Sequence, residues 1–158
     1  MIAKFYFEIL AFLIVIFIFV MCMNLLKKKI IHNNYIHSSL SKIDKMNGYE
    51  FEEYLFHLFK ESGYKVKRTP KSGDYGVDLV LINPDNKEKI AVQAKRYKKK
   101  VGVSAIQQVV GGMKYYGCEE AIVVTNSFFT QPAIDLALIN GVELIDRNNI
   151  NEFIKSWK

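Results

Sequence analysis

Three side chains on two neighbouring segments have the types and spacing needed to cut a phosphodiester bond. Asp78 opens the apolar segment DLVLI, and Gln93 and Lys95 lie two residues apart in KIAVQAK. Residues two apart on a strand point to the same face, so Gln93 and Lys95 should project together. If the two segments pair as a hairpin, Asp78 lies beside them. The pattern therefore predicts a cluster of one carboxylate, one amide and one ammonium group.

This cluster has the chemistry of metal-assisted hydrolysis. A hard cation such as Mg²⁺, with Mn²⁺ as the alternative, prefers oxygen ligands, which a carboxylate and an amide carbonyl supply. Asp78 is the charged ligand of the set and Gln93 the neutral one. The cation would polarise a phosphoryl oxygen and acidify a water, while Lys95 orients that water and stabilises negative charge. We therefore predict a catalytic site at Asp78, Gln93 and Lys95.

Each of these residues alone has an ordinary structural explanation. An aspartate that follows Gly76 and Val77 at the start of a strand is commonly a turn residue. The Gln-Ala-Lys segment that comes next is what favours a catalytic role for Asp78. Asp74, in SGDYG, fits a turn former better, so we rank it second to Asp78.

Regular elements follow one another after residue 46. Apolar residues at three- and four-residue spacing predict a first helix in GYEFEEYLFHLFKESGY, and short β-branched or alternating runs predict strands. Ser104 with Gln107 has the pattern of a capping box, and Thr130, Pro132 and Gly141 frame another helix. The order α-β-β-β-α-β-α-β-α predicts an α/β fold, a mixed central sheet flanked by helices. Strands are expected at 64–68, 77–82, 89–97, 121–125 and 142–145, and the later helices at 104–116, 130–141 and 148–157.

Several longer segments occur in an order typical of one nuclease family. They are GYEFEEYL, GDYGVDLV, VQAKRY, VSAIQQVVGG, AIVVTNSFFTQPAIDLA and GVELID. Over roughly Asn47 to Lys155 they make the chain similar to the Mrr-type restriction endonucleases of the PD-(D/E)XK nuclease superfamily. The resemblance implies a restriction-endonuclease-like fold, DNA cleavage with a divalent metal, and catalytic roles for Asp78, Gln93 and Lys95. Gln93 replaces the acidic residue usual in the wider superfamily, which leaves the number of bound metal ions open.

The same resemblance implies a glutamate near the metal on the first helix, where Glu50, Glu52 and Glu53 are available. On a helical wheel centred on Phe51, Glu52 lies at the flank of the apolar stripe and Glu53 points away from it. Glu52 is therefore the third predicted ligand of the metal ion, beside Asp78 and Gln93, and it would bind the ion directly or through a water molecule.

A basic run leads directly away from the predicted site and suits contact with DNA phosphates. Ser104 and Gln107, at the start of the next helix, could hold a phosphate through free backbone amides or could simply cap the helix. No glycine loop for a nucleotide and no base-reading module is recognisable, so a small-molecule cofactor is not expected and sequence preference stays open. The predicted DNA-binding residues are Arg96, Lys98, Lys99, Lys100, Ser104 and Gln107.

The N-terminal quarter has a different character. Phe5–Leu26 is almost entirely apolar and would span roughly 33 Å as a helix, which predicts a single-pass membrane anchor in contact with lipid through residues 5–26. A cleaved signal peptide is the alternative, but the run is long and lacks a small-residue cleavage site. Lysines at 27–29 place the C-terminal side in the cytoplasm. The predicted parts are an anchor over 1–26, a linker over 27–46 and a nuclease domain over 47–158.

The sequence as a whole predicts a membrane-anchored, Mg²⁺-dependent DNA endonuclease that restricts foreign or modified DNA. The net charge of +6 over 158 residues fits DNA or anionic lipid and does not choose between them. Two alternatives stay open, a DNA-binding or sensing module that does not cut and a nuclease selective for junctions or flaps. The oligomeric state is open as well, a homodimer included.

Overall fold

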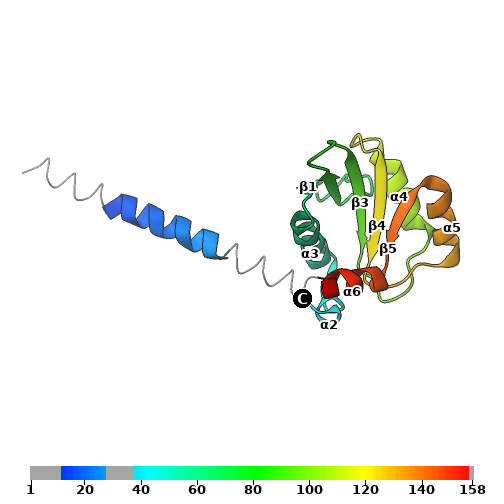
Figure 1. The fold of residues 1–158 in the computed structure, drawn as a ribbon, viewed down its shortest axis with the longest axis horizontal. Coiled ribbons are helices and arrows are strands. Elements are labelled where there is room, and N and C mark those ends of the chain that lie inside the picture. The colour runs from blue at the N-terminus through cyan, green and yellow to red at the C-terminus, as the bar shows by residue number, and fades with distance from the viewer. Residues whose placement is uncertain (1–11, 28–37, 157–158) are drawn as a thin grey trace, which may run out of the picture. The chain divides into compact units, whose positions relative to one another are not determined.

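The computed structural model describes residues 12–27 and 38–156, the latter with side chains as far as residue 152 (Figure 1). The chain divides into two units, residues 1–34 and residues 35–158. Each unit is described by itself below.

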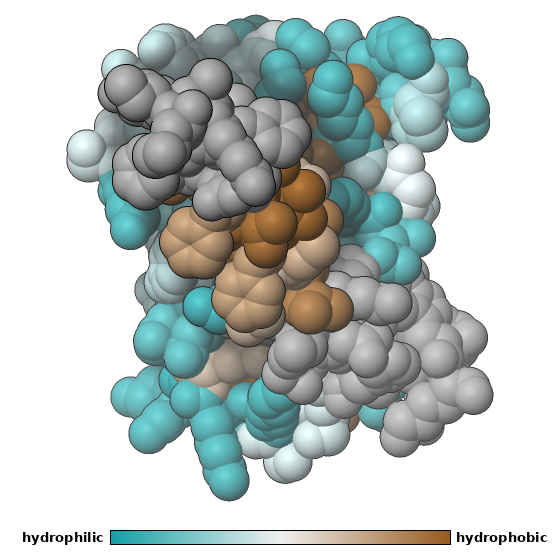
Figure 2. Space-filling view, turned by 90° about the vertical axis from the view of Figure 1, so that its left-hand side faces the viewer, coloured by the Kyte–Doolittle hydropathy of each residue, from teal (hydrophilic) through white to brown (hydrophobic). Residues whose placement is uncertain are grey.

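The described part of the first unit is a helix over residues 12–27, and most of its large apolar side chains are exposed. They form the brown area at the centre of Figure 2. None of the helices in residues 12–27 and 38–156 is long and apolar enough to cross a membrane. The predicted single-pass anchor and the cytoplasmic localisation built on it are therefore wrong, and the lipid contact predicted with them is not shown; residues 5–11 of that run lie outside the described residues.

The second unit is built on one five-stranded sheet in the order β1-β2-β3-β4-β5. The first three strands pair antiparallel, and β3, β4 and β5 run parallel, so the sheet is mixed as predicted. The strands are β1 Lys65–Arg68, β2 Leu79–Ile82, β3 Lys89–Lys95, β4 Glu120–Thr125 and β5 Val142–Ile145.

Helices cover both faces of this sheet. Figure 1 shows α3 on one side and α4 and α5 on the other. Leu79, Leu81 and Val92 pack with α3, whereas Val80 and Ala91 pack with α4, because successive strand residues point to opposite faces. By the same alternation Gln93 and Lys95 belong to the α4 side. The helices are α2 Leu40–Ile43, α3 Gly48–Glu61, α4 Val103–Met113, α5 Gln131–Asn140 and α6 Arg147–Ser156.

Capping residues explain where α3 begins and where α5 begins and ends. Asn47 and Glu50 close a reciprocal capping box at α3. At α5, Thr130 accepts a hydrogen bond from the Ala133 amide, and Gly141 ends the helix with φ of 65°, as the sequence predicted. The predicted capping box of Ser104 is wrong: α4 starts one residue earlier, after Gly102, and Ser104 lies inside its first turn.

Part of the predicted linker is folded onto the domain. Residues 38–46 contain α2, and Ile43 and Met46 are buried in the same core as α3. The remaining linker residues from 28 to 37 lie outside the described residues. The compact core thus includes residues before Asn47.

Candidate active site

A cleft lies at the end of the sheet where β2 begins and β3 ends. It consists of two adjoining hollows of about 290 Å³ and 390 Å³, which share the three carboxylates of Glu52, Asp74 and Asp78. Of the four predicted catalytic residues, Gln93 and Lys95 lie on β3, Asp78 directly precedes β2, and Glu52 lies on α3. All four line the smaller hollow, together with Asp74, Gly76, Ala94 and Gln108.

Asp78 is fixed against β3 by its own carboxylate. Its Oδ2 accepts hydrogen bonds from the amide of Ala94, at 2.7 Å, and from Nε2 of Gln93, and its backbone amide donates to the Val92 carbonyl at 2.8 Å. Burial raises the pKa of Asp78, although the Ala94 amide and the Lys95 charge oppose the shift. The antiparallel pairing of β2 with β3 therefore brings Asp78 beside Gln93, as the hairpin argument predicted.

Gln93 carries an unused acceptor at the cleft. Its side chain is only 3% exposed, and while Nε2 donates to Asp78, Oε1 has no hydrogen-bond partner in the described part of the chain. Buried polar atoms without a partner are rare, since leaving one unsatisfied costs about 1–3 kcal/mol. An oxygen in this position suits a ligand that binds in the cleft.

The three glutamates of the first helix have different partners. Glu52 lines both hollows, and burial, followed by the charges of Asp78 and Asp74, raises its pKa. The carboxylate of Glu53 binds Arg68 at 2.7 and 2.8 Å, and Glu50 closes the helix cap at 2.7 Å. Among the three, Glu52 has the environment expected of a catalytic carboxylate.

Two residues at the cleft were not among the predicted site residues. Asp74 does form the expected turn, since its Oδ1 accepts from the Gly76 amide at 3.0 Å, yet it also lines both hollows. Gln108 lines the smaller hollow, whereas the predicted Gln107 does not. Gln108 lies one helical turn before Gly112, so both residues are on the face of α4 that packs against the 73–76 loop. This shared face is the signal that could have identified Gln108.

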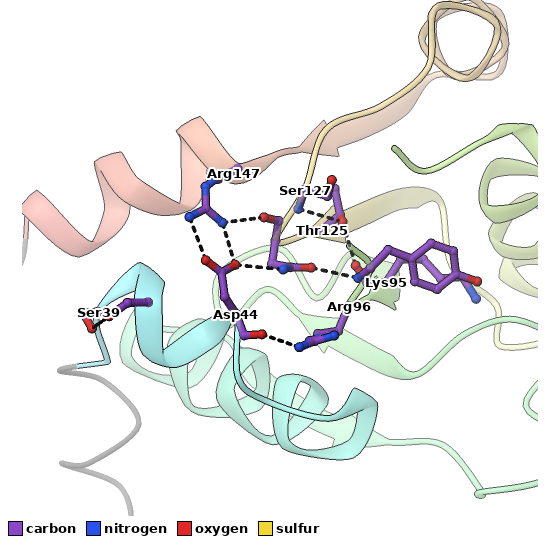
Figure 3. Close-up of polar contacts among 10 residues, drawn as sticks. Ser39, Asp44, Lys95, Arg96, Thr125, Ser127 and Arg147 are labelled. Atoms are coloured by element: carbon purple, nitrogen blue, oxygen red, sulfur yellow. Dashed lines mark hydrogen bonds and ion pairs between the residues drawn. The ribbon is translucent and has the colours of Figure 1, made fainter. Parts of the chain in front are cut away.

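The predicted DNA-binding residues lie mainly outside the cleft. Lys98, Lys99 and Lys100 are exposed in the segment after β3, and Ser104 and Gln107 are exposed on the first turns of α4. Arg96 is different, because its guanidinium donates to the backbone carbonyl of Asp44 (Figure 3), and its buried Nε has no hydrogen-bond partner among the described residues.

Asp44 forms the centre of a polar network beside the cleft. Its carboxylate accepts two hydrogen bonds from Arg147, at 2.6 and 2.8 Å, and one from Nδ2 of Asn126 at 3.0 Å (Figure 3). The hydrogen bond from Arg147 is the main cause that lowers the pKa of Asp44. The network joins the end of α2, the end of β4 and the start of α6.

This network also holds the chain where it leaves β3. Asn126 accepts a hydrogen bond from the Tyr97 amide at 2.8 Å, and the Thr125 hydroxyl donates to the Lys95 carbonyl at 2.7 Å. The backbone of Lys95 is therefore anchored from β4, directly beneath the side chain that lines the cleft.

Asp44→Asn is expected to lower the free energy of unfolding by about 1–2 kcal/mol near neutral pH, because it breaks a partly exposed bidentate pair. The folded-state pKa of Asp44 lies below its ordinary value of 3.8, so its contribution is present above that pH and is lost as the pH falls further. Urea unfolding should therefore show a difference between the proteins at pH 7 that shrinks below pH 3.8. Asp85→Asn, in an exposed turn, is the control, and an equal effect from it would contradict the role of Asp44.

The donor atoms of the cleft fit a hard divalent cation. No three His, Cys, Asp or Glu side chains in residues 12–27 and 38–156 converge as a metal-binding group. The available set is instead mixed, with carboxylates from Asp78 and Glu52 and the unpartnered Oε1 of Gln93. All are oxygen donors, which is the ligand type that Mg²⁺ and Mn²⁺ prefer.

Two solved structures are similar to the chain in fold. The crystal structure of the protein of unknown function AF1548 matches with a TM-score of 0.61 and 17% identity, over 70% of this chain and 67% of that one. The DNA modification-dependent restriction endonuclease AspBHI matches with a TM-score of 0.57 and 20% identity, over 82% of this chain and 34% of that one. The five-stranded mixed sheet and its flanking helices are thus similar to those of a restriction endonuclease.

Sequence comparison assigns the family. The type IV methyl-directed restriction enzyme EcoKMrr of Escherichia coli strain K12 is 30% identical over 103 residues, which are 61% of this chain and 34% of that enzyme. The chain thus spans about a third of that relative's length. The family model Mrr_cat, described as restriction endonuclease, matches residues 43–154, well over half of the chain and all of the cleft. The chain therefore belongs to the Mrr_cat family of restriction endonucleases.

Proposed function

We propose that this protein is a metal-dependent endonuclease that hydrolyses phosphodiester bonds of DNA in the cleft between α3 and α4. The observation that carries the proposal is the arrangement of Asp78, directly before β2, with Gln93 and Lys95 on the paired strand β3, where the buried Oε1 of Gln93 has no hydrogen-bond partner among the described residues. Membership of a restriction endonuclease family supports it.

Asp78, Glu52 and Gln93 would hold the metal ion, Mg²⁺ in the first place and Mn²⁺ as the alternative. When bound, the ion supplies a Lewis acid and a water of lowered pKa. The chain's own contribution is to fix these oxygens before the substrate arrives. Burial raises the pKa of Asp78 and of Glu52, which means that burial disfavours their charged forms. A bound cation would supply the positive charge that stabilises these carboxylates.

Lys95 would act on the reacting phosphate. Its side chain lines the smaller hollow beside Gln93, and its backbone is held by Thr125. The ammonium can orient the attacking water and stabilise the negative charge that develops on phosphate oxygens. Phosphates farther along the strand would contact the exposed Lys98, Lys99 and Lys100, with Ser104 and Gln107 beside them. Arg96 is left out of this set because its guanidinium binds Asp44.

The substrate proposed is foreign or modified DNA. EcoKMrr, a methyl-directed restriction enzyme, is similar to this chain in sequence, and AspBHI, a DNA modification-dependent restriction endonuclease, is similar to it in fold, each over about a third of its own length. Two copies of the site, one for each strand, would cut both strands of a duplex in one binding event, so we include a homodimer in the proposal. Sedimentation of the full chain with and without duplex DNA tests this part.

Glu52→Gln is expected to reduce cleavage by about 10- to 100-fold, since it removes one charge from the oxygens around the metal. Glu53→Gln is the matched control: it lies next in the helix but binds Arg68, and should leave cleavage within about threefold. Both rates are measured on supercoiled plasmid under single-turnover conditions. The reverse order of the two effects would show that the wrong glutamate is assigned.

The function itself is tested by incubating the full chain with methylated and unmethylated supercoiled plasmid, with Mg²⁺, with Mn²⁺ or with EDTA. We expect nicked and linear products only with a divalent ion, and more of them from methylated DNA. A retarded plasmid band without any change of topology would instead identify a binding module that does not cut.

A further inference from the structure

An exposed pair of aromatic rings lies beside the cleft. The side chains of Tyr75 and Tyr115 are 57% and 66% exposed, and their ring centroids are 4.4 Å apart with an interplanar angle of 39°. Tyr116 packs edge-on against Tyr115 at 5.0 Å. Aromatic rings contribute most to stability or binding when they are buried. An exposed pair of rings therefore indicates a surface that binds the flat, apolar face of another group.

The backbone places Tyr75 next to the catalytic residues. Its two chain neighbours, Asp74 and Gly76, both line the smaller hollow. Tyr75 itself has φ of 52°, a left-handed conformation that bulky residues seldom adopt. Such conformations persist where the surrounding structure holds them and are concentrated at functional sites. The result is a ring that stands out one residue away from the cleft.

Two glycine contacts fix this loop on α4. A side-chain carbon at Gly112 would overlap the Tyr75 carbonyl oxygen, and one at Gly76 would overlap the backbone of Gln108. The loop and the helix can therefore approach each other only because both positions are glycine. Since Tyr115 follows the end of the same helix, the two rings belong to one fixed surface.

We propose that Tyr75 and Tyr115 form a stacking platform for an unpaired nucleobase of the DNA strand that enters the cleft. The inference rests on the proposed nuclease function and names how its substrate is held. Bases stack on aromatic side chains regardless of sequence, and a base inside a duplex is already stacked, so the occupant must be unpaired. The exposed Lys114, directly before Tyr115, supplies a positive charge for the adjoining phosphate.

A second protein molecule fits this surface less well. Stable interfaces bury about 1,200–2,000 Å² in total, far more than two side chains offer. The residues that border the pair on the cleft side are polar, namely Asp74 and Gln108, so the apolar surface does not extend there as a protein interface would require. Continuity with the cleft is thus the main argument for a nucleobase.

The test measures binding by the full chain in EDTA, where no cleavage occurs. The probes are a fluorescein-labelled single-stranded oligothymidylate of about 15 nucleotides and a blunt duplex of the same length. Tyr75→Asn keeps a residue type that tolerates positive φ, and Tyr115→Ala removes the second ring. Each should weaken binding to the single strand by about 5- to 100-fold and to the duplex by at most about twofold.

Two controls separate stacking from other effects. Tyr115→Phe keeps the ring and should bind within about twofold of the natural protein, since stacking needs no hydroxyl. Leu138→Ala removes another exposed apolar side chain, 82% exposed on α5, and should change nothing. Equal melting temperatures show that the variants fold. Ultraviolet crosslinking of 5-iodouracil in the single strand should label Tyr75 or Tyr115 of the natural protein.

The platform would be overturned if Tyr75→Asn and Tyr115→Ala bound the single strand as tightly as the natural protein, or if crosslinks formed only at other residues. The nuclease function would still stand in that case, provided that the natural protein cleaved plasmid DNA. Loss of self-association in these variants, with unchanged DNA binding, would assign the pair to a second copy of the chain and also overturn it. Absence of any DNA binding and cleavage by the natural protein would defeat both proposals.

Discussion

Lys95→Ala is expected to lower the rate of DNA cleavage by about 10³-fold or more, while the protein stays folded and still binds metal. The Lys95 ammonium lies at the end of β3, in the hollow that also contains Asp78 and Gln93. Removing a charge placed at the reacting phosphate affects the transition state more than the bound substrate. The measurement is single-turnover nicking of supercoiled plasmid at saturating protein.

The size of this effect follows from what else surrounds the site. In the described part of the chain, Lys95 is the one cationic residue that lines the smaller hollow. The larger hollow includes Arg68 and Lys71, but Arg68 is paired with Glu53, and the Lys71 ammonium lies over the Tyr49 ring, 4.9 Å from its centroid. No neighbouring cation is therefore placed to replace Lys95. Lys95→Arg should restore little activity, because the guanidinium is larger, planar and differently hydrated.

Asp78→Asn separates the binding of the metal ion from the action of Lys95 on the reacting phosphate. It should also abolish cleavage, but through loss of the charged ligand, so calorimetric titration should show weaker binding of Mg²⁺ or Mn²⁺. Lys95→Ala should bind the same ion at least as well, because a nearby positive charge has been removed. If Lys95→Ala cleaved within about tenfold of the natural protein, the catalytic assignment of Lys95 would be wrong.

The order of elements was predictable because each carries its own local signal. The apolar stripe of α3, the β-branched run of β4 and the frame of Thr130 and Gly141 around α5 act within a few residues. These signals gave the order of helices and strands after Asn47. They also gave the hairpin that brings Asp78 to Gln93, since paired strands with a short connection need only local information.

Contacts between distant segments were not predictable in this way. Asp44, in the expected linker, binds Arg147 from the far end of the chain, and Arg96 turns to the Asp44 carbonyl instead of following the lysine run. When the partner of an arginine in a basic run is unknown, its charge suggests a contact with phosphate. Gln108 was missed for a similar reason, because its place at the cleft depends on how the 73–76 loop packs against α4.

The N-terminal prediction came from hydropathy, which measures only the composition of a run. It joined residues 5–26 into one apolar segment, and the structure describes a helix over residues 12–27. Among the described residues no helix is long and apolar enough to cross a membrane, which contradicts the prediction.

Two adjacent glycines in α4 should respond to alanine in opposite directions. Gly111→Ala is expected to raise the free energy of unfolding by about 0.5–1 kcal/mol, because a carbon there would meet no atom within 4 Å and alanine favours the helix. Gly112→Ala is expected to lower it by about 1–3 kcal/mol, because the same carbon would overlap the Tyr75 carbonyl and the Val77 side chain. Urea unfolding of the three proteins measures both effects.

The pair tests how the cleft is built, because the gain in helix propensity is common to both variants and only the contact with the loop differs. Gly112→Ala must push residues 73–76 away from α4, and with them Asp74 at the cleft. A displacement of this kind should slow plasmid cleavage by about 10- to 100-fold, whereas Gly111→Ala should cleave at the natural rate. Equal stabilisation by both substitutions would mean that the loop does not rest on the helix. Slower cleavage by Gly112→Ala without loss of stability would mean that the loop moves and so relieves the overlap. The substitution would then act on cleavage through the displaced Asp74 and not through the stability of the fold.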